Sequence, residues 1–84
     1  MKFSILDKGQ NKIEVEFNDI SSEQFRTYEF STGSKVRIEK PKWLYVSASG
    51  GHRLVDEEGI SHYIPSGWIH LWWKVKDGEP YFVR

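Results

Sequence analysis

The chain has 84 residues, no cysteine, and 12 basic against 12 acidic side chains. This length allows one small core and no second domain, so residues 1–84 are expected to form a single domain. The absence of cysteine excludes disulfides and thiolate zinc sites. A net charge of zero removes the overall attraction that draws strongly basic proteins to nucleic acid or anionic lipid, so such a partner would need a local basic patch.

Aromatic residues are the most unusual feature of the composition, with four Trp, four Tyr and five Phe. Large rings supply much apolar area per residue, so we expect a core rich in aromatic side chains. Asp7 arrives before an apolar run of signal-peptide length can form, and no stretch approaches membrane-spanning length. We therefore expect a cytoplasmic protein without a membrane partner.

Apolar and polar residues alternate with period two between short turn-rich segments, which indicates strands joined by hairpins. Residues 3–5 and 13–17 are expected to form the first hairpin around a turn at 7–10. The next residues break the alternation. Ser21 and Gln24 have the spacing of a capping box, so we expect at most one helical turn there.

A second hairpin is predicted from residues 26–31 and 35–40, with a turn at Thr32 and Gly33. Val36 and Ile38 are expected to face inward, because lysine, arginine and glutamate occupy the alternate positions. Pro41 then interrupts the ladder, since proline has no backbone N–H to donate.

The next strand, 43–48, has one aliphatic face, and we expect Leu44, Val46 and Ala48 to point inward. The segments 52–55 and 60–64 flank Asp56 to Gly59, which is a plausible hairpin loop.

The longest strand candidate spans residues 68–76, and its odd positions from Ile69 to Val75 are wholly apolar. Asp77 and Gly78 form a strong hairpin signal, which would lay residues 81–83 back along this strand. These elements predict an all-β, mainly antiparallel fold: a small barrel or sandwich of eight or nine short strands.

The first candidate binding surface is an aromatic stripe on the outward face of one sheet. It would contain Trp43 and Tyr45 from one strand and Trp68 and Trp72 from another. Exposed apolar patches mark interaction sites, and Trp and Tyr are enriched among interface hot spots. The alternative is that these rings are core, covered in a sandwich or by a second copy of the chain in a homodimer.

The second candidate combines the Gly50–Gly51 corner and the following His52 and Arg53 with His62 and Tyr63, and a hairpin through the acidic loop would bring these two segments side by side. Two glycines beside a cation and an imidazole resemble a backbone nest for an anion. The pattern lacks the length and the lysine of a P-loop. A glycine-rich turn, with Arg53 paired to the neighbouring acids, is the simpler interpretation.

His52, His62 and His70 would supply three nitrogen ligands to zinc if they converged. Their spacing matches no known motif, and histidines that hydrogen-bond locally explain it better. We therefore predict no metal and no cofactor.

No catalytic arrangement is apparent. The acids at 56–58 fall in a tight loop that points them to water. Ser61 and His62 are chain neighbours on a strand and so face opposite sides. The sequence gives no support for an enzyme.

A nucleic-acid interpretation rests on a local excess of basic residues beside Trp43 and Tyr45, because basic grooves interleaved with rings bind single strands on small barrels. The simpler interpretation is an ordinary solvated strand face. The basic residues are Lys35, Arg37, Lys40, Lys42 and Arg53.

Together these features predict a non-enzymatic domain that binds another macromolecule, with protein as the first choice of partner. A small bacterial or phage adaptor or inhibitor fits this description, and a single-stranded nucleic-acid binder is the alternative. The predicted binding residues are Trp43, Tyr45, His52, Arg53, His62, Trp68, His70 and Trp72.

Overall fold

A computed structural model describes residues 2–6 and 12–78, with side chains described from Glu16 onward. These residues form nine strands and no helix, which confirms the all-β prediction. Within the described ranges there is accordingly no helix long and apolar enough to cross a membrane. The strand predicted at 81–83 lies outside the described residues. The strands are β1 (Lys2–Leu6), β2 (Lys12–Glu16), β3 (Asn18–Asp19), β4 (Glu23–Phe30), β5 (Lys35–Glu39), β6 (Pro41–Val46), β7 (His52–Asp56), β8 (Ser61–Ile64) and β9 (Trp68–Val75).

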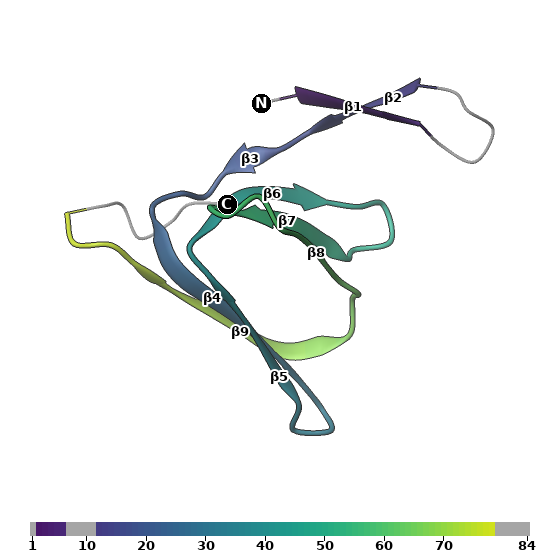
Figure 1. The fold of residues 1–84 in the computed structure, drawn as a ribbon. Coiled ribbons are helices and arrows are strands. Elements are labelled where there is room, and N and C mark those ends of the chain that lie inside the picture. Colours follow the sequence, from purple (N-terminus) through teal and green to yellow (C-terminus); the bar gives the residue numbers. More distant parts are fainter. Residues whose placement is uncertain (1, 7–11, 79–84) are drawn as a thin grey trace.

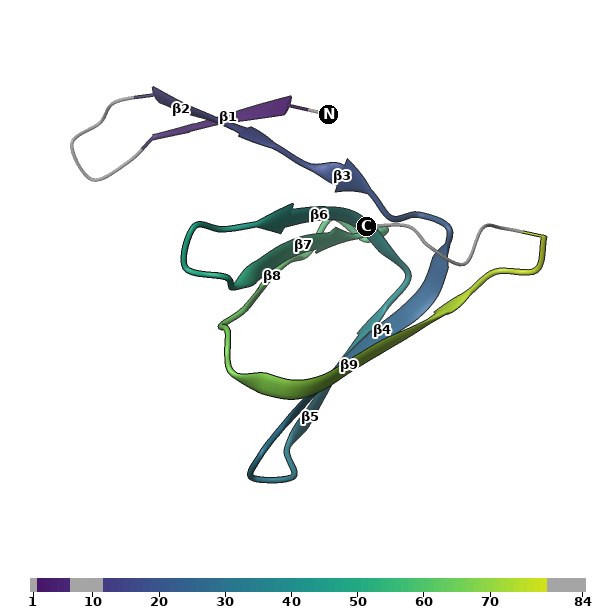
Figure 2. The ribbon, with the colours of Figure 1, turned by 180° about the vertical axis from the view of Figure 1, so that it is seen from behind.

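The strands form three antiparallel sheets: the hairpin β1-β2, a four-stranded sheet β3-β6-β7-β8 and a three-stranded sheet β5-β4-β9. Figures 1 and 2 show the two larger sheets facing each other, with the β1-β2 hairpin continuing into β3. Among the described strands no ladder joins the larger sheets. The fold is therefore an open, sandwich-like arrangement and not a closed barrel.

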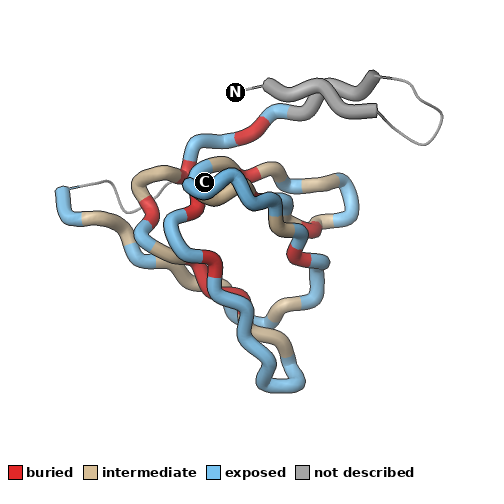
Figure 3. Tube along the Cα trace, in the orientation of Figure 1, coloured by how far each residue is buried: buried red, intermediate tan, exposed pale blue. Residues whose placement is uncertain are grey.

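The core lies between the two larger sheets, where inward side chains from both meet. The buried residues form short stretches along the chain, separated by intermediate and exposed ones (Figure 3). Phe30, Trp68 and Leu71 pack against this core from the three-stranded sheet. The buried core residues are Ile20, Tyr28, Ile38, Leu44, Leu54 and Ile64.

The helical turn expected near Ser21 and Gln24 is replaced by a tight turn. The Glu23 N–H donates to the Ile20 carbonyl at 2.9 Å, and Gln24 already belongs to β4. Asp19 stabilises the turn instead of Ser21, because its Oδ1 accepts from the Ser21 N–H at 2.9 Å and from the Ser21 hydroxyl at 2.6 Å. These hydrogen bonds hold the pKa of Asp19 below its usual value.

The apolar odd positions of β9, which alternate with the predicted outward Trp68 and Trp72, do not all turn inward. Leu71, Trp73 and Val75 are partly buried, but Ile69 is 67% exposed. The reason is a register shift between Glu29 and Phe30, which pairs Phe30 with Trp68. An irregularity of this kind changes the face on which the following side chains lie.

Three further residues predicted to face inward are exposed at or near strand ends: Val36, Val46 and Ala48. Ile38 is buried, but Val36 is 37% exposed because the β4-β5 hairpin projects beyond the four-stranded sheet (Figures 1 and 2). Ala48 is exposed because it lies in the turn after β6. Pro41 does separate two strands as predicted, and it forms the first residue of β6.

Candidate functional site

The predicted aromatic stripe does not form on one sheet. Trp43 and Tyr45 lie on β6 in the four-stranded sheet, whereas Trp68 and Trp72 lie on β9 in the three-stranded sheet. All four rings are partly buried. The prediction of a single surface is therefore wrong, because strand pairing separates β6 from β9.

Trp68 belongs to the core. Its ring lies 5.0 Å from Tyr28 and 4.6 Å from His52, in edge-on contacts that connect the two larger sheets. The alternative interpretation, in which the rings are core, therefore describes Trp68. Trp72 lies 4.6 Å from the exposed His70 and opposite Thr27, away from the core.

Tyr45, Arg53 and Tyr63 form a row across three adjacent strands, which we call the Arg53 row. Tyr45 pairs with Arg53, and Arg53 pairs with Tyr63. The Arg53 guanidinium lies over the Tyr63 ring at 5.7 Å. Tyr45 stacks on Phe17 at 5.7 Å, which supports its ring from the other side.

The Arg53 row is accessible. Arg53 is exposed and Tyr63 is 49% exposed. Among the described side chains, no carboxylate lies within ion-pair distance of Arg53. The predicted pairing of Arg53 with the neighbouring loop acids therefore does not form, and its donors face solvent between two rings.

The glycine corner shapes this row and offers no anion nest. The Gly50 N–H donates to the Ser47 carbonyl at 2.9 Å, so it is already used in the turn. Gly51 is buried, and a Cβ there would lie 2.4 Å from the Tyr63 hydroxyl oxygen. The Tyr63 ring therefore occupies the space that a side chain at position 51 would fill. Hydrogen bonding to Ser49, at 3.4 Å, lowers the pKa of Tyr63.

The three histidines do not converge. His52 contacts Tyr28 in the interior, His62 Nε2 lies 2.8 Å from Asp56 Oδ2, and His70 lies exposed on β9. The bond to His62 is the main reason that the pKa of Asp56 lies below its usual value. Within the described residues, no group of three or more metal-ligating side chains comes together. Only His62 makes the local hydrogen bond that the simpler interpretation expected, because His52 bonds across to the other sheet and His70 lies 3.7 Å from Glu29.

The basic residues are divided between the two larger sheets. Arg37 lies on β5, where it pairs with Glu39 and covers the Phe25 ring at 3.7 Å. Lys42 lies on β6, 6.0 Å from the Trp43 ring, and Arg53 lies on β7. They are therefore not one compact basic groove.

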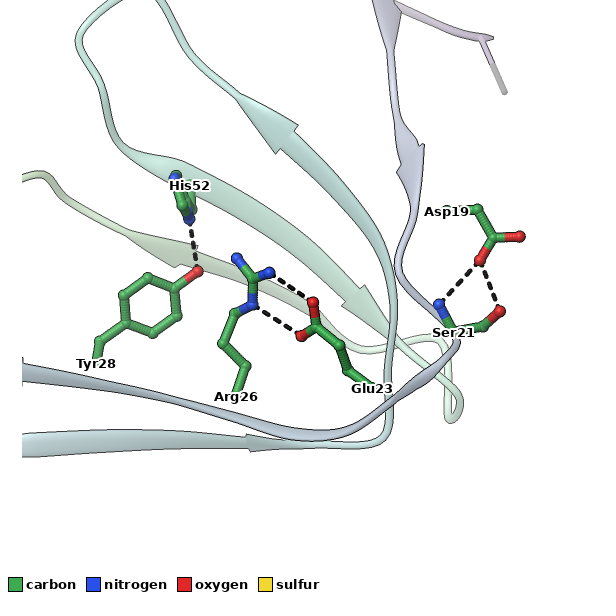
Figure 4. Close-up of polar contacts among 6 residues, drawn as sticks. All are labelled: Asp19, Ser21, Glu23, Arg26, Tyr28 and His52. Carbon is green, nitrogen blue, oxygen red and sulfur yellow. Dashed lines mark hydrogen bonds and ion pairs between the residues drawn. The ribbon is translucent and has the colours of Figure 1, made fainter. Parts of the chain in front are cut away.

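A second polar cluster, which no sequence pattern indicated, is buried between the sheets. Arg26 donates to Glu23 through Nε at 2.8 Å and through a terminal nitrogen at 2.6 Å (Figure 4). The exposed fractions of these side chains are 3% for Arg26 and 0% for Glu23. The guanidinium also lies 4.9 Å from the Trp73 ring.

Tyr28 extends this cluster to the opposite sheet. Its hydroxyl oxygen lies 2.6 Å from Nδ1 of His52 (Figure 4). Burial raises the pKa of Tyr28, and hydrogen bonding to Arg26 opposes this effect. Burial, with a smaller contribution from the charge of Arg26, lowers the pKa of His52 to about 4. Alternation along β4 places Arg26 and Tyr28 on one face, but no local pattern indicates that an arginine there is buried.

No protein-family model matches this chain, and comparison with curated proteins and with solved structures finds no match either.

Proposed function

We propose that this domain is a non-enzymatic binding module that contacts a protein partner through the Arg53 row. The observation that carries the proposal is an exposed Arg53 between Tyr45 and Tyr63, with no described carboxylate paired to it. Arginine and tyrosine are enriched among residues that dominate interface energies. A rigid ring on each side limits the entropy lost when such a surface is covered.

The chemistry of the row also indicates what it would contact. A guanidinium has only donors, so its partner groups are carboxylates or main-chain carbonyls. The flanking rings would pack on apolar side chains around that contact. In this proposal the domain acts by binding alone, as a small bacterial or phage adaptor or inhibitor would, in the cytoplasm.

Photo-crosslinking tests this proposal. A photoreactive residue placed at Val55, beside Trp43 in the ladder, should capture a specific protein, and Arg53→Glu should abolish that capture. Arg37→Glu is the matched control, because Arg37 is also exposed but lies on the other sheet. Equal capture by the wild-type chain and the Arg53→Glu variant would refute the proposal.

Single-stranded nucleic acid remains the alternative partner, and salt dependence separates the two. Phosphate contacts make affinity fall steeply as salt rises, whereas apolar protein interfaces respond weakly. Tight binding of a fluorescent oligonucleotide that is lost between about 50 and 200 mM salt, and lost with Arg53→Glu, would favour nucleic acid over protein.

A further inference from the structure

A cavity of about 260 Å³ lies between the two larger sheets, apart from the Arg53 row. One wall comes from β6 and β7, through Leu44, Val46 and His52, and the other from β4 and β9. Its remaining lining residues are Asn18, Arg26, Leu71 and Trp73.

Val46 shows that the sheets do not close over this space. It lies two residues after the buried Leu44, so both side chains point to the same face of β6. Leu44 is 3% exposed, but Val46 is 49% exposed. Interiors are normally close-packed, so an inward apolar side chain with half its surface free indicates space for another molecule.

The polar wall of the cavity has a defined hydrogen-bond direction. Arg26 can only donate, and its proximity acts to lower the pKa of Tyr28, so we assign the Tyr28 oxygen as the acceptor that faces Arg26. The single hydroxyl proton of Tyr28 then goes to Nδ1 of His52, at 2.6 Å. A neutral imidazole that accepts at Nδ1 carries its own proton on Nε2. With this assignment His52, which lines the cavity, carries an N–H donor at Nε2.

The wall carries no uncompensated charge. Glu23 neutralises Arg26 through two hydrogen bonds, and a pKa of about 4 keeps His52 neutral near pH 7. Arg26 already lies over the Trp73 ring, so its charge disfavours a cationic ligand there. A charged ligand would lose its hydration without gaining a free counter-ion.

We propose that this cavity binds a small neutral aromatic molecule whose hydrogen-bond acceptor meets the Nε2–H of His52. The walls of Leu44, Val46, Leu71 and Trp73 suit a flat apolar ring system. A cavity of about 150 Å³ holds benzene, so the 260 Å³ here suits a fused two-ring molecule. This inference does not depend on the Arg53 row.

Nuclear magnetic resonance of the ¹⁵N-labelled full chain, titrated with coumarin, tests the proposal. Coumarin is a neutral fused two-ring molecule with a carbonyl acceptor, and naphthalene is its analogue without an acceptor. Coumarin should shift the Trp73 indole N–H and the His52 ring signals, with a dissociation constant on the order of 1 mM or below. Naphthalene should bind more weakly, and 2-naphthoate should not bind.

Two variants make the test specific. Val46→Trp fills the cavity from a half-exposed position and should abolish coumarin binding, whereas Val36→Trp, on β5 away from the cavity, should leave it unchanged. His52→Phe should weaken the binding of coumarin by roughly three- to tenfold, since it removes one neutral hydrogen bond. The binding of naphthalene should be unaffected. The absence of coumarin shifts at about 1 mM, or shifts that survive Val46→Trp, would overturn the proposal. Equal loss of both ligands in His52→Phe would refute the hydrogen bond.

Discussion

The hydroxyl oxygen of Tyr28 lies 2.6 Å from Nδ1 of His52, and this hydrogen bond connects the three-stranded sheet to the four-stranded sheet. Tyr28 is fully buried, so its hydroxyl cannot exchange this partner for bulk water. Buried polar groups are costly when left unpaired. The pair therefore contributes to the alignment of the two sheets.

Tyr28→Phe should lower the free energy of unfolding by about 1 to 3 kcal/mol, because it leaves His52 Nδ1 without its hydrogen-bond partner. Urea denaturation measures this. Tyr45→Phe is the matched control, and a change within about 0.5 kcal/mol is expected there because Tyr45 is only partly buried. Equal losses of unfolding free energy in the two variants would contradict a stabilising hydrogen bond between Tyr28 and His52.

Stability should fall as pH drops from 6.5 toward 4. His52 has a folded-state pKa of about 4 against an ordinary 6.5, so the unfolded chain binds a proton in this window and the folded chain does not. The contribution of neutral His52 is therefore fully present above pH 6.5 and is lost as pH falls. The full shift corresponds to about 3 kcal/mol, which partial exposure of the ring reduces to about 1 to 2 kcal/mol.

Denaturation of a His52→Gln variant checks this assignment. The fall in the free energy of unfolding between pH 6.5 and 4 should be smaller in His52→Gln. It should be unchanged in His70→Gln, whose side chain is 62% exposed. Asp19 and Asp56 have lowered pKa values, so their contributions disappear at more acidic pH. An unchanged slope in His52→Gln would show that another group titrates.

Glu23→Gln should destabilise the fold by about 3 kcal/mol or more, because it leaves the buried Arg26 charge uncompensated. Glu39→Gln removes the partner of the exposed Arg37 and should cost less than about 1 kcal/mol. The double change Glu23→Leu with Arg26→Met should recover most of the loss, since it removes both charges. A small effect of Glu23→Gln would mean that water reaches Arg26.

Gly51→Ala should displace Tyr63 and weaken binding through the Arg53 row. The new Cβ would lie 2.4 Å from the Tyr63 hydroxyl oxygen and 2.8 Å from Cζ, so the ring must move. Because the ring end is flexible and half exposed, the loss of stability should stay near about 1 kcal/mol. Crosslinking yield and the Tyr63 ring signals report the change, and a ring that keeps its signals would contradict the clash.

Local sequence patterns predicted the hairpins well. Alternation located the strands around the turns at 31–34 and 57–60, because turn residues and period-two patterning act over a few positions. The same pattern placed Arg53 beside Tyr63, since the hairpin loop sets that register. It did not predict that Tyr45 would complete the row while Trp68 and Trp72 lie on another sheet.

The sequence by itself determined the all-β class, the order of the hairpins along the chain and the high content of aromatic side chains. These features depend only on side-chain type and on short spacings. Only the tertiary structure decided which faces meet. The register shift beside Phe30 turned Trp68 inward and left Ile69 exposed. The burial of Arg26 with Glu23, and the bond from Tyr28 to His52, depend on two sheets that no local pattern relates to each other.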